Sequence, residues 1–192
     1  MKKILLVAFW ALSLASIAQN NSLGLTTSVN LTTSTAKDSK WKFGGNVGML
    51  YDVNIADNWF LQPRLTLGYE EMELKGNPVG CSFISQWNVT IPVLLSYKLD
   101  VSPVTALRLN LGPYAQYAAF GRERQSFTDG ERLGWWHGNF SRRFTYGAQI
   151  GAALECGSHF MILLDSKLSL KSSRLAFEGK ERSVMLGIGY KF

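Results

Sequence analysis

Charged side chains recur at alternating positions inside otherwise apolar segments of this chain. In an extended strand such residues share one face, opposite the aliphatic side chains. If that face is enclosed, each charge must be paired, since an isolated buried charge is very costly. Arg64 and Arg108 lie near mid-strand, and we expect them to pair with carboxylates such as Glu70, Glu155 or Asp165. The chemistry is then either an ion-pair plug or a path for protons or ions. The candidate network comprises Asp52, Arg64, Glu70, Arg108, Glu155, Asp165 and Lys167.

A second group combines arginine with aromatic residues in the segment 121–143. Arginine with tryptophan and phenylalanine is the composition of protein-interface anchors. Arginine also pairs bidentately with phosphate, as on lipid A. Two interpretations follow: a binding surface for a protein, or an aromatic girdle whose arginines contact lipid phosphates. The candidate residues are Arg122, Arg124, Arg132, Trp135, Trp136, Phe140, Arg142 and Arg143.

Enzymatic chemistry has few residues available. Nucleophilic catalysis needs a base beside a serine or similar group, and the chain has two histidines, His137 and His159. His159 follows Ser158, and His137 lies between Ser126 and Ser141. Neither matches a known motif, and no metal-ligand spacing or nucleotide-binding loop is present. We therefore expect a non-enzymatic protein without cofactor or metal, and keep a lipid A-modifying enzyme as the third hypothesis.

These residues lie on segments that alternate apolar and polar side chains. In 182–192, Val184, Leu186, Ile188 and Tyr190 share one face, and small or polar residues occupy the other. This pattern suits lipid outside and a narrow polar lumen inside. Eight segments predict strands: 22–33, 41–53, 59–71, 83–98, 104–119, 142–155, 159–170 and 182–192.

The spacing of these segments predicts an all-β fold, an eight-stranded antiparallel up-and-down transmembrane β-barrel. Short connections at 54–58, 100–103 and 156–158 alternate with longer ones, of which 121–141 is the longest. Short periplasmic turns and longer extracellular loops are typical of such barrels. A soluble β-sandwich is the alternative. It is disfavoured because aromatic residues gather near strand ends and glycine is frequent on the polar faces.

The N-terminal segment indicates export. Lys2 and Lys3 precede an apolar run and a small-x-small site ending at Ala18. We expect residues 1–18 to be a cleaved signal peptide and 19–192 to be the barrel, located in the outer membrane of a Gram-negative bacterium.

The cysteines and the net charge add two expectations. Cys81 and Cys156 fall at opposite ends of the predicted strands, too far apart for a disulfide. The net charge of +6 comes from scattered cations, so no nucleic-acid partner is expected.

Two further motifs resemble a known family. The stretch Asn88-Val-Thr-Ile-Pro-Val-Leu-Leu-Ser-Tyr-Lys98 and the stretch Leu111-Gly-Pro-Tyr-Ala115 resemble successive strands of small PorT-like outer-membrane barrels of Bacteroidota. The resemblance implies a barrel that binds through its extracellular loops or serves in an envelope complex for secretion or uptake. A narrow porin-like channel for ions or small solutes is the runner-up. Outer-membrane lipid and lipopolysaccharide are expected partners, and the terminal strand ending at Phe192 is typical of substrates of the barrel-assembly machinery.

Overall fold

A computed structural model describes residues 21–35, 39–75, 80–127, 130–135, 143–171 and 180–192. For residues 72–75, 80–84, 123–127 and 130–135 it describes only the backbone. The expected signal peptide, 1–18, lies outside the described residues. No helix in the described ranges is long and apolar enough to cross a membrane.

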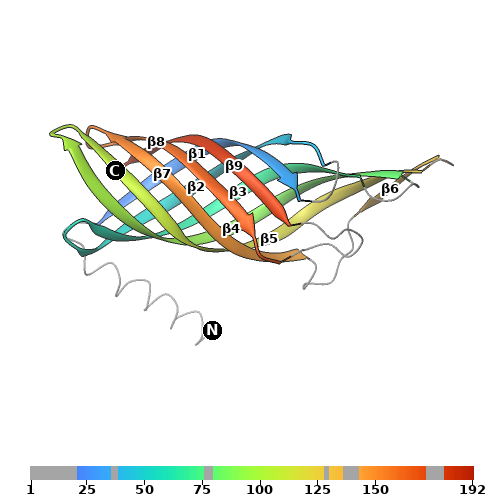
Figure 1. Ribbon diagram of the computed structural model, residues 1–192, viewed down its shortest axis with the longest axis horizontal. Helices are drawn as coiled ribbons and strands as arrows, with labels where there is room; N and C mark the ends of the chain where they lie inside the picture. The colour runs from blue at the N-terminus through green and yellow to red at the C-terminus, as the bar shows by residue number, and fades with distance from the viewer. Residues whose placement is uncertain (1–20, 36–38, 76–79, 128–129, 136–142, 172–179) are drawn as a thin grey trace, which may run out of the picture.

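Eight strands form a closed antiparallel barrel (Figure 1). Strands β1 to β5 each pair with the next strand in sequence, β5 pairs with β7, β7 with β8 and β8 with β9, and the pairing of β9 with β1 closes the ring. Within the described residues, a further strand, β6, pairs with β5 alone and lies outside the ring. The strands are β1 Ser22–Ser34, β2 Lys42–Ala56, β3 Trp59–Lys75, β4 Gly80–Ser102, β5 Thr105–Phe127, β6 Gly130–Trp135, β7 Phe144–Cys156, β8 Phe160–Ser169 and β9 Glu181–Lys191.

The predicted fold is confirmed, and all eight predicted strands are present. The closed ring rules out the sandwich, whose two sheets would each keep open edges. The connection predicted over 121–141 was wrong for residues 121–127 and 130–135, while 128–129 and 136–141 lie outside the described residues. Residues 121–127 continue β5, and 130–135 form β6 beside them.

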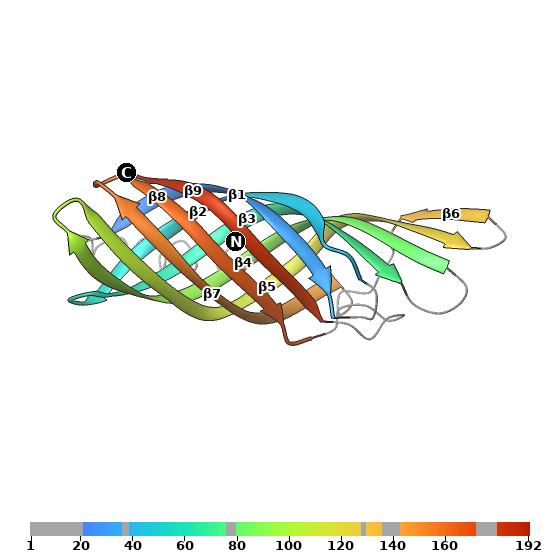
Figure 2. The same cartoon turned by 45° about the horizontal axis from the view of Figure 1, so that its top comes forward.

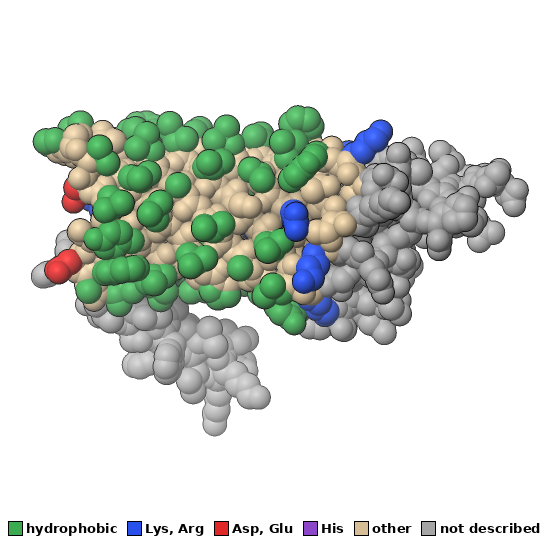
Figure 3. All heavy atoms as spheres, viewed as in Figure 1, with side chains coloured by type: hydrophobic (Ala, Val, Ile, Leu, Met, Phe, Trp, Pro, Cys, Tyr) green, Lys and Arg blue, Asp and Glu red, His purple; other side chains and the backbone are tan. Residues whose placement is uncertain are grey.

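Over most of each strand, side chains alternate between the lumen and the outer surface. In β9, for example, Ser183, Met185 and Lys191 are buried while Leu186 and Ile188 are exposed. The period-two alternation of a strand places every second residue in the lumen. The outer surface is therefore covered with exposed aliphatic side chains along the length of the barrel (Figure 3). Such a surface is suited to lipid.

Aromatic rings flank this apolar surface at both ends. Trp59 and Tyr97 lie 4.7 Å apart between ring centroids at one end, and Tyr69 and Trp87 lie 5.4 Å apart at the other. Ten residues of β3 separate the two levels, about 33 Å along the strand, which a tilt of roughly 45° reduces to about 23 Å. The result matches the ~25 Å apolar band of outer-membrane barrels.

The two ends of the barrel differ. At the end called here the turn end, short connections at 57–58, 103–104 and 157–159 join the strands. Gly157 has φ 68°, a left-handed conformation that glycine adopts without strain. The opposite end, the loop end, carries the longer connections. Cys156 is a free thiol at the turn end, and Cys81 pairs with Ser126 at the loop end, so the expected absence of a disulfide between them is confirmed.

Beyond the loop end, four strand segments continue as an open sheet. We call the segments 71–75, 80–86, 121–127 and 130–135 of β3, β4, β5 and β6 the raised sheet. The ladder between β2 and β3 stops at Gly45 and Tyr69, whereas β3 pairs with β4 as far as Lys75 and Cys81. Figure 2 shows β6 and the adjoining strand ends projecting past the barrel on the right.

Candidate functional site

Four charged residues meet in the lumen near the turn end. Arg108 lies 3.0 Å from Asp52 and 2.7 Å from Glu155 between charged atoms. Lys191 contacts the same two carboxylates. The guanidinium of Arg108 also lies 4.2 Å from the ring centroid of Phe60, a cation–π contact. Two cations and two anions thus form one closed network, called here the turn-end cluster.

An amide connects this cluster to the next ion pair. Gln62 donates from Nε2 to Asp52 at 2.5 Å and accepts at Oε1 from Nε of Arg64 at 2.8 Å. Arg64 in turn pairs with Asp165 at 2.8 Å. The chain of contacts therefore crosses the lumen from β2 through β3 to β8.

A second cluster lies nearer the loop end. Lys167 pairs with Glu70 at 2.9 Å and donates to Oε1 of Gln116 at 3.1 Å. The other carboxylate oxygen of Glu70 accepts hydrogen bonds from Asn88 at 2.7 Å and from Gln116 at 3.1 Å. We call these residues the loop-end cluster. Both oxygens of the Glu70 carboxylate are satisfied, as a buried carboxylate requires.

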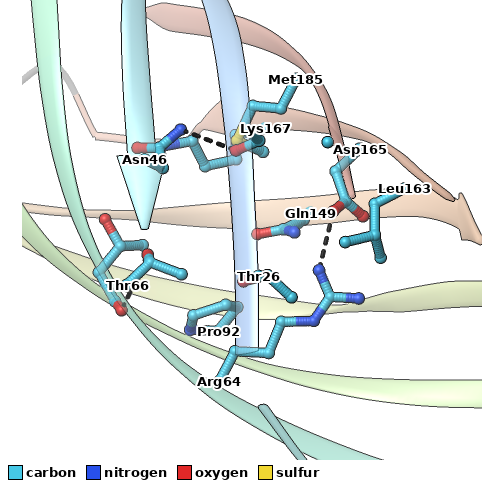
Figure 4. Close-up of a pocket in the computed structure, with 13 residues that line it drawn as sticks. Thr26, Asn46, Arg64, Thr66, Pro92, Gln149, Leu163, Asp165, Lys167 and Met185 are labelled. Atoms are coloured by element: carbon cyan, nitrogen blue, oxygen red, sulfur yellow. Dashed lines mark hydrogen bonds and ion pairs between the residues drawn. The ribbon is translucent and has the colours of Figure 1, made fainter. Parts of the chain in front are cut away.

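Between the two clusters lies a polar cavity of about 30 Å³ (Figure 4). Its lining includes Arg64, Asp165 and Lys167 together with hydroxyl and amide side chains. This volume suffices for on the order of two water molecules. Figure 4 shows Arg64 directed towards Asp165 across the space.

The charges of the two clusters and the Arg64–Asp165 pair cancel. Each of the four cations faces a carboxylate within 3.0 Å. Paired in this way, the charges can remain ionised away from bulk water. The arrangement can join the strands across the lumen and obstruct passage of solutes. The eight charged residues are Asp52, Arg64, Glu70, Arg108, Glu155, Asp165, Lys167 and Lys191.

The structure brings all seven sequence-predicted lumen residues into the lumen. The expectation that Arg64 and Arg108 pair with carboxylates is confirmed. The bridging amides Gln62, Asn88 and Gln116 were not predicted, although their position on the polar face was a signal. Lys191 lies on the same face and was also left out of the candidate network.

The predicted loop surface is described only in part. Arg122 is exposed on β5, and Arg143 is half-buried just before β7. Trp136, Phe140 and Arg142 lie outside the described residues. The backbones of Arg124, Arg132 and Trp135 fall within β5 and β6, in the portion without described side chains.

His159 lies at the turn end. Its ring nitrogen Nδ1 is 2.8 Å from the carbonyl oxygen of Lys191, and the ring stacks on Tyr190 with a centroid distance of 5.3 Å. These contacts give His159 a packing role at the C-terminal strand. His137 lies outside the described residues. Within the described part of the chain, no three His, Cys, Asp or Glu side chains gather as metal ligands would.

Comparison with known proteins agrees with this architecture. The model of a family described as "outer membrane protein beta-barrel domain" matches residues 17–174. No curated protein sequence matches the chain at a significant level.

One solved outer-membrane barrel, Neisserial surface protein A, shares the fold with a TM-score above 0.5, and two others are less similar. Neisserial surface protein A is 10% identical, with a TM-score of 0.51 over 91% of this chain and 100% of its own. The attachment invasion locus protein of Yersinia pestis is 15% identical, with a TM-score of 0.47 over 90% and 99%. The outer membrane enzyme PagL is 12% identical, with a TM-score of 0.48 over 84% and 97%. At such low identities the likeness concerns the fold alone.

Proposed function

The chain belongs to the outer membrane protein beta-barrel domain family, and we propose that this member is a non-enzymatic barrel that binds a protein partner through its raised sheet. The lumen then has a structural role, and the functional surface lies outside the membrane. A cleaved signal peptide at 1–18 accounts for export to this location.

The observation that carries the proposal is the open edges of the raised sheet. Among the described residues, β6 pairs with β5 on one side only. Residues 71–75 of β3 pair with β4, and no strand in the part of the chain that the structure describes pairs with them on the β2 side. An open edge presents unpaired backbone N–H and C=O groups to which an extended segment of another protein can add. Side-chain pockets would then supply specificity.

The composition of the same region supports a protein partner. The region contains Arg122 and Arg124 on β5 and Arg132 and Trp135 on β6, and Trp136 follows β6 in the sequence. Arginine and tryptophan supply much of the binding energy in protein interfaces. The PorT-like resemblance of residues 88–98 and 111–115 supports membership of an envelope complex for secretion or uptake.

The narrow-channel alternative rests on the polar cavity in the lumen. Its volume of about 30 Å³ admits only water-sized molecules, and an ion-paired cluster lies on each side. Because eight strands enclose little more than their own side chains, we infer that the barrel conducts poorly. The lipid A-modifying enzyme, our third hypothesis, would have to use His137 or His159, and its test is loss of a lipid A modification in His137→Ala or His159→Ala.

The proposal is tested by removing the projecting hairpin. Arg122 and Trp135 are cross-strand partners, so residues 123–134 can be replaced by Asn-Gly, which closes a two-residue hairpin. The tagged protein is purified from native outer membranes in mild detergent. A stoichiometric partner should accompany the natural sequence and be lost from the shortened variant and from Trp135→Ala/Trp136→Ala.

The matched control is Trp41→Ala, which removes an exposed tryptophan just before β2, outside the raised sheet. This variant should retain the partner. Retention of the partner by the shortened hairpin, or recovery of the barrel alone from native membranes, would contradict the proposal. Planar-bilayer conductance would then test the channel.

A further inference from the structure

The outer wall of the barrel has an apolar groove at the loop end. The groove has a volume of about 570 Å³ and lies across β3, β4 and β5. Tyr69, Trp87 and Phe120 form one cross-strand row along it. In the next row, which already belongs to the raised sheet, Ser85 pairs with Arg122. The groove thus has aromatic walls and a cation at its outer end.

A β-bulge accounts for the hollow. Trp87 pairs with Phe120 and Asn88 with Ala118, so Ala119 has no partner on β4. A bulge bends its strand and increases the local twist, and here β5 leaves the barrel for the raised sheet. The backbone of Gly121, which follows Phe120, contributes to the lining of the groove. Phe120 itself is 72% exposed on the groove wall.

Charged side chains on the outer surface are distributed unevenly along the barrel, and cations predominate at the loop end, where the groove lies. Lys and Arg side chains gather beside the loop end, and Asp and Glu side chains are visible at the turn end (Figure 3). Asp57 and Asp100 are at the turn end, whereas, among the side chains that the structure describes, the loop end has Glu71 and Glu181 with a larger number of cations. The described cations near the loop end are Lys40, Lys42, Arg122, Arg143, Lys171, Lys180 and Arg182.

We propose that this groove binds a phosphorylated glycolipid of the outer leaflet, with one acyl chain between Phe120 and Trp87 and a phosphate on Arg122. The apolar walls accommodate a hydrocarbon chain at the membrane edge. The Arg122 guanidinium donates N–H groups to phosphate oxygens, for which its planar geometry is suited. The other cations of the loop end attract further phosphates of the same lipid layer, which favours a glycolipid with several phosphates over a singly charged phospholipid. The proposal rests on the membrane placement of the barrel and not on the protein-binding role.

The test measures binding of lipid A to the full mature barrel in detergent micelles by native mass spectrometry. Bisphosphorylated lipid A, its dephosphorylated form and phosphatidylglycerol are titrated separately. Bisphosphorylated lipid A should bind most tightly. Equal affinity for phosphatidylglycerol would overturn the assignment to a glycolipid, and equal affinity for the dephosphorylated form would overturn the role of phosphate.

Two variants test separately how the charge of Arg122 and the apolar groove contribute to lipid A binding. Arg122→Gln should weaken lipid A binding roughly fivefold to tenfold, since a membrane-surface cation contributes about 1 kcal/mol towards an anionic lipid. Ser85→Trp keeps every cation but fills the groove, and it should abolish tight binding of the acylated ligand. Unchanged affinity in either variant would overturn the proposed site.

Matched controls lie at the turn end. Lys98→Gln removes a partly exposed cation, and Phe160→Ala removes a ring that is 65% exposed, close to the exposure of Phe120. Neither should change the affinity, whereas Phe120→Ala should reduce it. If Lys98→Gln weakened lipid A binding as much as Arg122→Gln, the binding would reflect general electrostatic attraction and not a specific site at the groove.

Removing the charge of Glu71 should have the opposite effect on lipid A binding, an increase in affinity. Glu71 lies in the row of Ser85 and Arg122, and its carboxylate accepts a hydrogen bond from the Tyr69 hydroxyl at 2.7 Å. Its negative charge repels a phosphate on Arg122, so Glu71→Gln should tighten lipid A binding by a few fold. A weaker complex in Glu71→Gln would contradict the proposed position of the phosphate.

Discussion

At the scale of single residues, Asp52 joins more partners than any other carboxylate of the turn-end cluster. Gln62, Arg108 and Lys191 all contact it, and its side chain is fully buried. A buried ion that loses its partner stays desolvated without compensation. The stability of the barrel therefore depends on each buried charge of the lumen keeping all of its partners, more than on any single contact.

We expect Asp52→Ala to destabilise the barrel by roughly 3–5 kcal/mol, because Arg108 and Lys191 would then share Glu155 alone. The measurement is urea-induced unfolding in lipid vesicles. Asp100→Ala is the control, since Asp100 is well exposed and pairs with a partly exposed Lys98, and a pair at the surface contributes about 1 kcal/mol or less. Similar losses in the two variants would contradict this view of the cluster.

The pair Glu70 and Lys167 should show energetic coupling. Glu70→Gln and Lys167→Met each leave a buried partner charge, whereas the double variant removes both charges. We expect a coupling free energy of about 1–3 kcal/mol in a double-mutant cycle of unfolding. Lys167→Met combined with Asp100→Asn, a distant site, should be additive. Additivity in the first cycle would show that the two residues do not act together.

At the scale of strands, the tight pairing of β4 and β5 depends on glycine at one position. A Cβ added to Gly112 would lie 2.1 Å from the carbonyl oxygen of Val93. A Cβ at Gly45 would meet only the carbonyl oxygen of Ser28, at 3.6 Å, an ordinary contact. Gly45 is therefore a suitable control position for the same substitution at Gly112.

Gly112→Ala should therefore destabilise the barrel by roughly 1–3 kcal/mol, because the two strands must separate locally. Gly45→Ala should change the stability little. Heat-dependent migration on gels, which distinguishes folded from unfolded barrels, gives the comparison. Equal thermal stability of the two variants would refute the steric argument.

The strands were predictable from the sequence because their periodicity depends only on which face meets lipid. The lumen residues followed from the same alternation, including Arg64 and Arg108. Which lumen side chains pair with one another depends on the stagger of the strands around the barrel. The sequence near each residue does not determine this stagger. Hence Asp165 was one of several candidate partners for Arg64, and the bridging Gln62 was missed.

The raised sheet was missed for a related reason. Residues 121–127 and 130–135 are rich in arginine, glutamate and glycine, and they lack the apolar alternation that marks a strand facing lipid. Outside a membrane, both faces of a projecting sheet can be polar. Backbone pairing with β4 and β5 stabilises these strands, and that pairing leaves no apolar signature.

At the scale of the whole molecule, the lumen should be closed to ions. Reconstituted in planar bilayers, the barrel should give no steady current, because paired side chains fill the lumen. Replacing Arg64, Glu70, Asp165 and Lys167 together by serine removes two ion pairs and leaves only small side chains in their place. This variant should have a measurable conductance. A steady current through the natural sequence would instead favour the channel hypothesis.

The pairing of β1 with β9 has a consequence for the timing of assembly. These strands carry the ladder that runs from Gly24 and Lys191 to Ser34 and Glu181, and Thr32 donates a hydrogen bond to Ser183 at 3.1 Å. Until β1 meets β9, a partly formed sheet has two edges of unpaired backbone groups that can pair with other chains. Contacts so distant in sequence form slowly, so we expect an exported chain to depend on periplasmic chaperones and on an assembly machinery that keeps the β1 edge accessible to β9.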